Sequence, residues 1–187
     1  MDNKKTNVKK PNPIHINQYK LSHMIGVAEW MRERASAYEV DEDIAYFIGL
    51  NHDIGYLRGR NGHEKYGGSL LWSIGVNSDI CNAIAHHDQN PYKLISNGEC
   101  SFDDITPEYV LLLEADLSVD VRGYKVGFDR RLKDIKSRYD DCNMDDLLDT
   151  IKFIKEYQEK NGISKPPRNM FDKEKMQYDE KEIWIHL

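Results

Sequence analysis

Residues Leu50-Asn51-His52-Asp53-Ile54-Gly55-Tyr56 place a histidine and an aspartate side by side at the end of an apolar run. The segment from Asp41 to Leu50 predicts a helix, because its first turn is acidic and its apolar residues recur at helical spacing. Gly55 is a typical helix stop. We therefore expect His52 and Asp53 in the last turn of a largely buried helix. Burying both side chains costs free energy unless a metal ion or a mutual hydrogen bond satisfies them.

The composition is that of one acidic globular domain. The chain has 187 residues, of which 40% are hydrophobic and 31% charged, so a packed core is feasible. The formal net charge is −6, whereas duplex nucleic-acid binders are normally basic, so nucleic acid is an unlikely partner. Cys81, Cys100 and Cys142 are widely spaced and form no C-x-x-C motif. They predict free thiols in a reducing cytosol rather than disulfides or a thiolate metal site.

The polar, lysine-rich start of the chain is not followed by an apolar segment, which argues against a signal peptide. No apolar run reaches membrane-spanning length. We therefore expect a cytoplasmic protein that makes no membrane contact. The predicted organisation is a flexible lead-in over residues 1–16, one domain over residues 17–162, and a tail over residues 163–187 that docks on this domain.

Strand signals are scarce along the chain, so we predict an all-α fold. Apolar residues at three- and four-residue steps predict a helix from about Asn17, and Asn77, Thr106 and Asn143 are predicted N-caps of later helices. Further expectations are a helix that opens at His63, an apolar helix that ends in Asp116, a polar loop over residues 89–104 broken by Pro91, a charged segment with a sparse apolar stripe over residues 121–140, a helix stop at Gly162, and a short strand or docked segment over residues 182–187.

Several polar residues end or interrupt the predicted buried helices, and all are histidines or aspartates. Helical bundles build metal sites from such side chains on facing helices. Mixed imidazole and carboxylate ligands favour a divalent ion such as Mn, Fe, Zn, Ni or Mg. Taken singly, a histidine is more often a satisfied core residue, and Asp116 could equally be exposed at its helix end. The set consists of His23, His52, Asp53, His63, His86 or His87, and Asp116.

The order of a histidine, a His-Asp pair and a distant aspartate resembles the HD-domain superfamily of metal-dependent phosphohydrolases. Here these residues are His23, His52-Asp53 and Asp116, and the frequent extension His-Asp-Ile-Gly is intact at residues 52–55. The resemblance covers about Asn17 to Tyr139. It implies packed helices around a metal ion, with these four residues as its ligands.

Some members of this superfamily add two histidines between the His-Asp pair and the last aspartate, and hold two metal ions. His63 and His87 occupy those places, with His86 as an alternative to His87. The full set resembles bacterial HD hydrolases that split dinucleoside polyphosphates and the HD-GYP cyclic-dinucleotide phosphodiesterases. Gly55-Tyr56 is not followed by proline, which disfavours the HD-GYP group. With two ions bound, Asp53 would bridge them, and Asp53, His63 and His87 would be the catalytic residues.

The resemblance implies a metal-dependent hydrolase of a nucleotide or another small phosphate ester or anhydride. A divalent ion lowers the pKa of bound water towards ~7 and so supplies hydroxide. Substrate phosphates need basic partners, for which we predict Arg58, Lys65 and Arg122; their alternative is to be solvated surface charges. Two other functions stay open: a di-iron oxygenase with the same ligands, and a non-catalytic regulatory module, which the complete ligand set disfavours. The sequence leaves a homodimer open as well.

Overall fold

The computed structural model describes residues 18–101, 105–139 and 142–172, and the structural statements below concern these residues. They form α-helices and short 3-10 turns, with a single isolated β-bridge between Val119 and Lys125 and no strand. The all-α prediction is therefore confirmed. The helices are α1 (Gln18–Arg34), α2 (Glu42–Asn51), α3 (His63–Ser73), α4 (Ser78–His86), α5 (Pro91–Ser96), α6 (Pro107–Asp116), α7 (Phe128–Arg138) and α8 (Met144–Lys160), with 3-10 turns η1 (Ala35–Tyr38), η2 (Ile54–Leu57) and η4 (Arg168–Met170).

Three helices begin at the N-caps that the sequence predicts, and a fourth helix, α2, is capped by Asp41. The side chain of Asp41 accepts hydrogen bonds from the backbone N–H groups of Asp43 and Ile44 at the start of α2. Asn77, Thr106 and Asn143 cap α4, α6 and α8 in the same way. Each cap satisfies backbone donors that have no partner inside the helix.

The structure corrects two expectations about secondary structure, one about a predicted loop and one about the end of a helix. The segment predicted as a loop over residues 89–104 contains α5, because the Asn90 side chain caps Tyr92 N–H and Pro91 occupies the first turn. Proline is tolerated there because the missing N–H would have no partner anyway. Helix α2 ends at Asn51, so His52 is its C-cap and Asp53 precedes η2 rather than lying in the last helical turn. The segment predicted over residues 182–187 lies outside the described residues.

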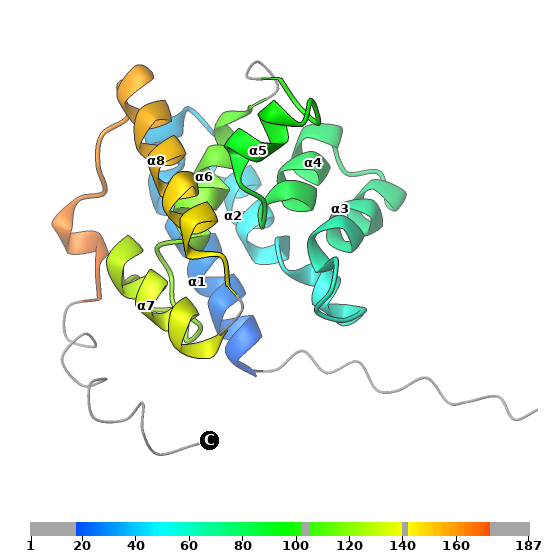
Figure 1. Ribbon diagram of the computed structural model, residues 1–187, viewed down its shortest axis with the longest axis horizontal. Coiled ribbons are helices and arrows are strands. Elements are labelled where there is room, and N and C mark those ends of the chain that lie inside the picture. The colour runs from blue at the N-terminus through cyan, green and yellow to red at the C-terminus, as the bar shows by residue number, and fades with distance from the viewer. Residues whose placement is uncertain (1–17, 102–104, 140–141, 173–187) are drawn as a thin grey trace, which may run out of the picture.

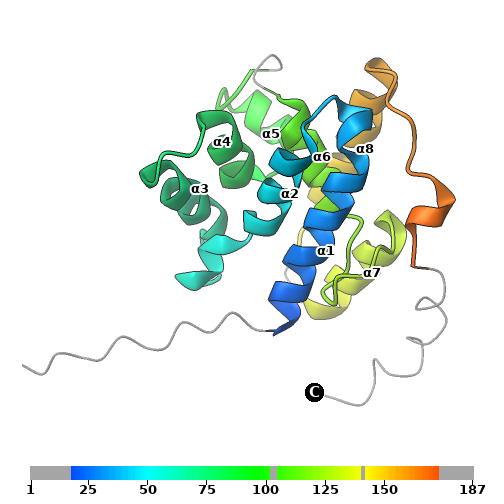
Figure 2. The ribbon, with the colours of Figure 1, turned by 180° about the vertical axis from the view of Figure 1, so that it is seen from behind.

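Helix α6 lies at the centre of the bundle and is buried from Tyr109 to Ala115. Helix α1 packs along α2 and against α6, and α8 packs against α5, α6 and α7. The opposite views in Figures 1 and 2 show α3 and α4 at one end of the molecule and α7 and α8 at the other, with α1, α2 and α6 between them. None of the helices described is both long and apolar enough to cross a membrane.

The segment after α8 contacts α1 as far as it is described. The carbonyl of Ser164 accepts a hydrogen bond of 2.6 Å from Arg34, which also forms a buried ion pair with Glu114 of α6. The Phe171 ring packs edge-on against Trp30, with ring centres 5.6 Å apart. Residues 163–172 therefore lie against the domain, while the predicted docking of residues 173–187 concerns positions outside the described part of the chain.

The close packing of α1 on α2 predicts a stability effect at Gly49. A Cβ atom at this position would lie 2.6 Å from the Cα atom of Ala28, so the two helices would have to separate. Overpacking of this kind costs about 1–3 kcal/mol, and Gly49→Ala should lower the free energy of unfolding by that amount in denaturant titrations. Gly67→Ala in α3 is the matched control, because its nearest contact is 3.3 Å and alanine has the higher helix propensity. Equal stabilities of the two variants would contradict the prediction.

Candidate metal centre

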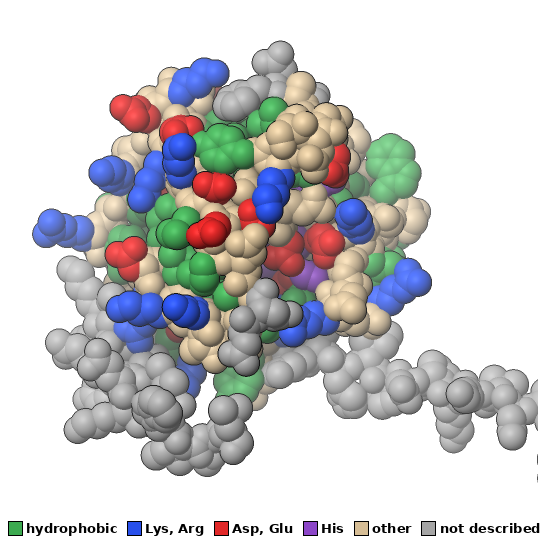
Figure 3. Space-filling model, viewed as in Figure 1, with side chains coloured by type: hydrophobic (Ala, Val, Ile, Leu, Met, Phe, Trp, Pro, Cys, Tyr) green, Lys and Arg blue, Asp and Glu red, His purple; other side chains and the backbone are tan. Residues whose placement is uncertain are grey.

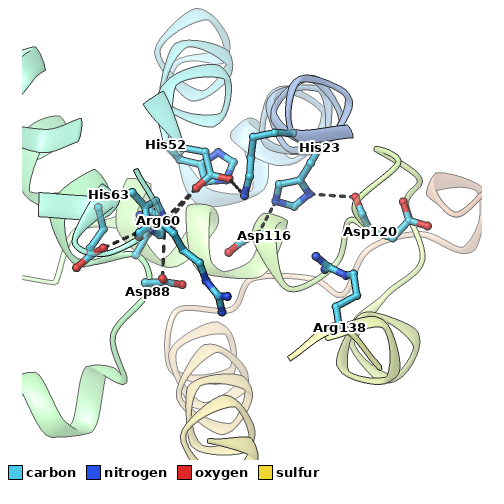
Figure 4. Close-up of polar contacts among 12 residues, drawn as sticks. His23, His52, Arg60, His63, Asp88, Asp116, Asp120 and Arg138 are labelled. Atoms are coloured by element: carbon cyan, nitrogen blue, oxygen red, sulfur yellow. Dashed lines mark hydrogen bonds and ion pairs between the residues drawn. The ribbon is translucent and has the colours of Figure 1, made fainter. Parts of the chain in front are cut away.

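Four buried histidines from four separate helices converge beside the carboxylates of Asp53 and Asp116. Figure 4 shows three of these histidines, His23, His52 and His63, together with Asp116. His23 lies on α1 and His63 is the first residue of α3. His52 and His87 are the C-caps of α2 and α4, and Asp116 is the last residue of α6. The structure thus brings together all six residues that the sequence analysis proposes as metal ligands.

Each of the four imidazoles is oriented by a backbone carbonyl. The Nδ1 atoms of His52, His63 and His87 lie 2.7, 3.0 and 2.7 Å from the carbonyl oxygens of the residues three positions earlier in the chain. The Nδ1 atom of His23 lies 3.0 Å from the carbonyl oxygen of Asp120. A carbonyl can only accept, so each Nδ1 carries a proton. In the neutral ring the lone pair is then on Nε2, the arrangement typical of metal-ligating histidines.

The Nε2 atoms face the two carboxylates. That of His23 lies 2.8 Å from an oxygen of Asp116, and that of His63 lies 3.0 Å from an oxygen of Asp53. The Nε2 atoms of His52 and His87 lie 3.4 and 3.6 Å from Asp53. The Nε2 atom of His52 is fully buried and makes no hydrogen bond within the described residues. A buried polar atom without a partner is costly unless it binds something else.

These distances fit a divalent metal centre. Two ligands bound at 2.0–2.2 Å to one ion lie about 3.0–3.5 Å apart, close to the separations found here. Two overlapping groups have ligand atoms within 4.8 Å of one another, namely His23, His52 and Asp116, and His52, Asp53 and His87. Two further groups add Glu64 and Asp88, which the sequence analysis did not single out although each directly follows a predicted ligand.

The geometry distinguishes His87 from its neighbour His86. His87 is buried and its Nε2 points to Asp53, whereas His86 is only half-buried and its Nδ1 lies 3.4 Å from the amide oxygen of Gln89. His86 is also not among the residues that line the pocket. Its position therefore favours His87 as the ligand of the pair.

Gly55 of the His-Asp-Ile-Gly stretch has a steric role. A Cβ atom there would lie 1.7 Å from the carbonyl oxygen of His63. Any side chain at this position would push the start of α3 away from Asp53. The glycine is thus needed for the close approach of His63, and not as the helix stop that the sequence suggests, because α2 has already ended at Asn51.

Both carboxylates and three of the histidines, His23, His63 and His87, line a pocket of about 500 Å³, whereas His52 is fully buried. Figure 3 shows histidine side chains inside this hollow, with acidic and basic side chains around it. Four basic and five acidic side chains line the pocket within the described residues. The basic ones are Lys20, Arg60, Arg131 and Arg138, and the acidic ones are Asp53, Glu64, Asp88, Asp116 and Asp146.

The three residues predicted to bind substrate do not line this pocket. Arg58 is exposed and its guanidinium lies 5.1 Å from the ring centre of Tyr66, because the loop before α3 turns it outwards. Lys65 is exposed on the outer face of α3. Arg122 lies in the turn after α6, where its backbone N–H donates to Asp120. The four basic residues that do line the pocket come from other positions.

Lys20 and Arg131 are the basic residues nearest to the proposed ligands. The Lys20 ammonium lies 2.9 Å from Asp53 and 3.6 Å from the ring centre of Tyr56. Its spacing of three residues from His23 places both on one face of α1, so the sequence itself already indicates that Lys20 lies near the proposed ligands. Arg131 is buried and donates to both the carbonyl and the side chain of Asp116, at 3.0 and 3.2 Å.

An all-α fold with histidines and aspartates gathered from separate helices defines a class of helical metal-site proteins. Within that class, the model of the HD domain family matches residues 21–114, just over half of the chain. The chain therefore belongs to the HD domain family. No curated protein and no solved structure matches the chain in the corresponding comparisons. Asp116 and all of α7 lie beyond the matched residues.

The placement of the two adjacent histidines predicts different effects on metal content. His87→Ala removes an Nε2 atom that faces Asp53, so bound metal should fall by about one ion per chain in protein purified with its metal. His86→Ala is the matched control and should retain the wild-type content, since His86 lies outside the pocket. Elemental analysis by mass spectrometry measures both. Equal metal loss in the two variants would rule out this assignment.

The carboxylates are held in their ionised form. Burial alone would raise the pKa of Asp53, but His52 and hydrogen bonds from the surrounding histidines hold it well below its usual range. Burial would likewise raise the pKa of Asp116, and His23 and Arg131 hold it low. Burial alone would lower the pKa of His87, but its contact with the Asp53 carboxylate and the charge of Asp88 raise it to about 9.

The raised pKa of His87 predicts that metal competes with a proton. In protein stripped with EDTA, the folded-state pKa exceeds the unfolded value, so this shift stabilises the fold fully below pH ~6.5 and progressively less as pH rises through about 9. Metal binding must displace this proton, so Mn²⁺ affinity should rise about tenfold per pH unit between pH 7 and 8.5. Calorimetry in buffers of different ionisation enthalpy should detect close to one proton released at pH 7. A Mn²⁺ affinity that does not change with pH would disprove the competition between metal and proton at His87.

Proposed function

We propose that this protein is a metal-dependent phosphohydrolase that acts on a small phosphate ester or anhydride such as a nucleotide. One observation carries the proposal: of four converging imidazoles and two carboxylates, three imidazoles and both carboxylates line a pocket together with four basic side chains. Membership in the HD domain family supports the metal-binding part of the proposal.

In this proposal His23, His52, Asp53 and Asp116 would hold one divalent ion, and His63, His87 and Asp53 would hold a second. When bound, such ions supply hydroxide at neutral pH and stabilise the charge on the oxygens of an in-line displacement. Arg131 acts as a positioning residue, because its two hydrogen bonds fix the orientation of the Asp116 carboxylate.

Phosphate binding is assigned to the basic residues that line the pocket. Lys20, Arg60, Arg131 and Arg138 replace Arg58, Lys65 and Arg122 in this role, because only the former group faces the proposed metal ligands. The lining carboxylates outnumber the basic side chains by one, and a proton on His87 brings the net charge of the metal-free wall to zero. One divalent ion in place of that proton makes the net charge positive. A phosphate should therefore bind after the metal, and EDTA-treated protein should bind it poorly.

A di-iron oxygenase is the second candidate, since imidazole and carboxylate ligands also suit iron. The substrate of an oxygenase would need no basic pocket, whereas a phosphate substrate needs one. The oxygenase would also require oxygen for turnover, and the hydrolase would not. A regulatory module that binds metal without catalysis is the third, and it would show neither phosphate release nor oxygen consumption.

The test is a phosphate-release screen across nucleotides and polyphosphates with protein loaded with Mn²⁺, Fe²⁺, Zn²⁺ or Ni²⁺ under anaerobic conditions. The proposal predicts turnover without oxygen. Asp53→Asn should lower kcat/KM by ~10³-fold or more, because metal-ion catalysis contributes several kcal/mol of transition-state stabilisation. Asp129→Asn is the control, since Asp129 is exposed on α7 and outside the pocket. Turnover that requires oxygen, or equal activity of the two variants, would refute a hydrolase.

A further inference from the structure

Two arginines from opposite walls of the pocket meet on one tyrosine ring. The guanidinium carbon of Arg60 lies 4.3 Å from the ring centre of Tyr139, and that of Arg138 lies 4.9 Å from it. All three residues line the pocket. In Figure 4 Arg60 extends from the side of His63, and Arg138 faces it from the side of α7.

The spacing of the two arginines suits a bound phosphate. The contacts with Tyr139 place the two guanidinium carbons at most about 9 Å apart. A phosphate that accepts hydrogen bonds of ~2.8 Å from two arginines holds their guanidinium carbons ~8 Å apart, with the phosphorus between them. Arg also presents a planar pair of donors to such an anion. The two arginines are thus near enough to each other for one phosphate to contact both.

The charges around this pair are only partly compensated. Arg138 donates to both oxygens of Asp134, at 3.0 and 2.8 Å, and to the hydroxyl of Tyr139 at 3.2 Å. Asp134 also accepts from Arg131 at 2.8 Å, so one carboxylate serves two arginines. Arg60 has no carboxylate partner in the described part of the chain, where its side chain contacts Tyr139. Among the described residues, the pair therefore keeps a net positive charge facing the pocket.

Both arginines are connected to the proposed metal ligands. The carbonyl oxygen of Arg60 accepts from Nδ1 of His63, so the residue that orients this ring also extends its side chain across the pocket. On the other wall, Asp134 links Arg138 to Arg131, which donates to Asp116. The position of the arginine pair relative to the metal centre is thereby set from both sides.

We propose that Arg60, Tyr139 and Arg138 form an anion clamp that binds a second phosphate of the substrate, separate from the one held at the metal centre. The clamp selects compounds with two linked phosphates over simple monoesters. This inference rests on the proposed function for the identity of the substrate, but the clamp itself is a binding site that can be measured without turnover. Two of its residues, Arg138 and Tyr139, lie beyond the part of the chain matched by the family model.

The test compares two non-hydrolysable probes, methylphosphonate and methylenebisphosphonate, by calorimetry with the full, Mn²⁺-loaded chain. Wild-type protein should bind the bisphosphonate at least ~10-fold more tightly. Arg60→Gln and Arg138→Gln should each lower the ratio of the two affinities by ~10-fold, because each removes a charged donor from the clamp. Arg58→Gln is the matched control: it removes the same charge from the same loop but outside the pocket, and should keep the wild-type ratio.

Metal content and circular dichroism establish that each variant is folded and loaded. Arg138→Gln breaks the Arg138–Asp134 ion pair and can disturb α7. Arg60 is exposed, so Arg60→Gln should fold normally and gives a clear result by itself. An Arg60→Gln ratio equal to that of Arg58→Gln would overturn the clamp. A lowered ratio with no hydrolysis of any phosphate compound would refute the proposed function and leave the clamp standing. Hydrolysis of a phosphate compound together with an unchanged affinity ratio in Arg60→Gln would support the proposed function and refute the clamp.

Discussion

The buried carboxylate of Asp53 is the constraint around which this end of the bundle is built. It accepts contacts from Lys20 of α1 at 2.9 Å and His63 of α3 at 3.0 Å, and lies 3.4 and 3.6 Å from His52 and His87. A buried charge is tolerated only with such partners. The ionised form of Asp53 thus depends on the packing of four helices around it. A metal ion would bind to a carboxylate that is already ionised.

Helix ends supply the second element of the site. The last carbonyls of a helix lack partners inside it. In α2 and α4, the carbonyls of Gly49 and Ile84 are satisfied by the imidazoles of His52 and His87, three residues further on. The same hydrogen bond therefore completes the helix and turns Nε2 towards the pocket, so that one local device provides both helix termination and ligand orientation.

The two walls of the pocket differ in origin. The histidines and Asp53 lie within the segment matched by the HD domain family. Arg131, Arg138 and Tyr139 come from α7 and its end, beyond that segment, yet Arg131 contacts Asp116 directly. The division is not complete, because Asp116 lies beyond the matched segment and Arg60 lies within it.

The sequence by itself determined the all-α fold, the caps at Asn77, Thr106 and Asn143, and the set of histidines and aspartates that come together. Caps and apolar stripes depend on residues within four positions, so local chemistry suffices to identify them. The basic wall of the pocket was decided only in three dimensions. Arg60 and Tyr139 are 79 positions apart and meet because α3 and α7 border the same pocket, whereas Arg58, two residues away, turns to Tyr66. The direction of a loop side chain depends on packing between distant helices, which local spacing does not encode.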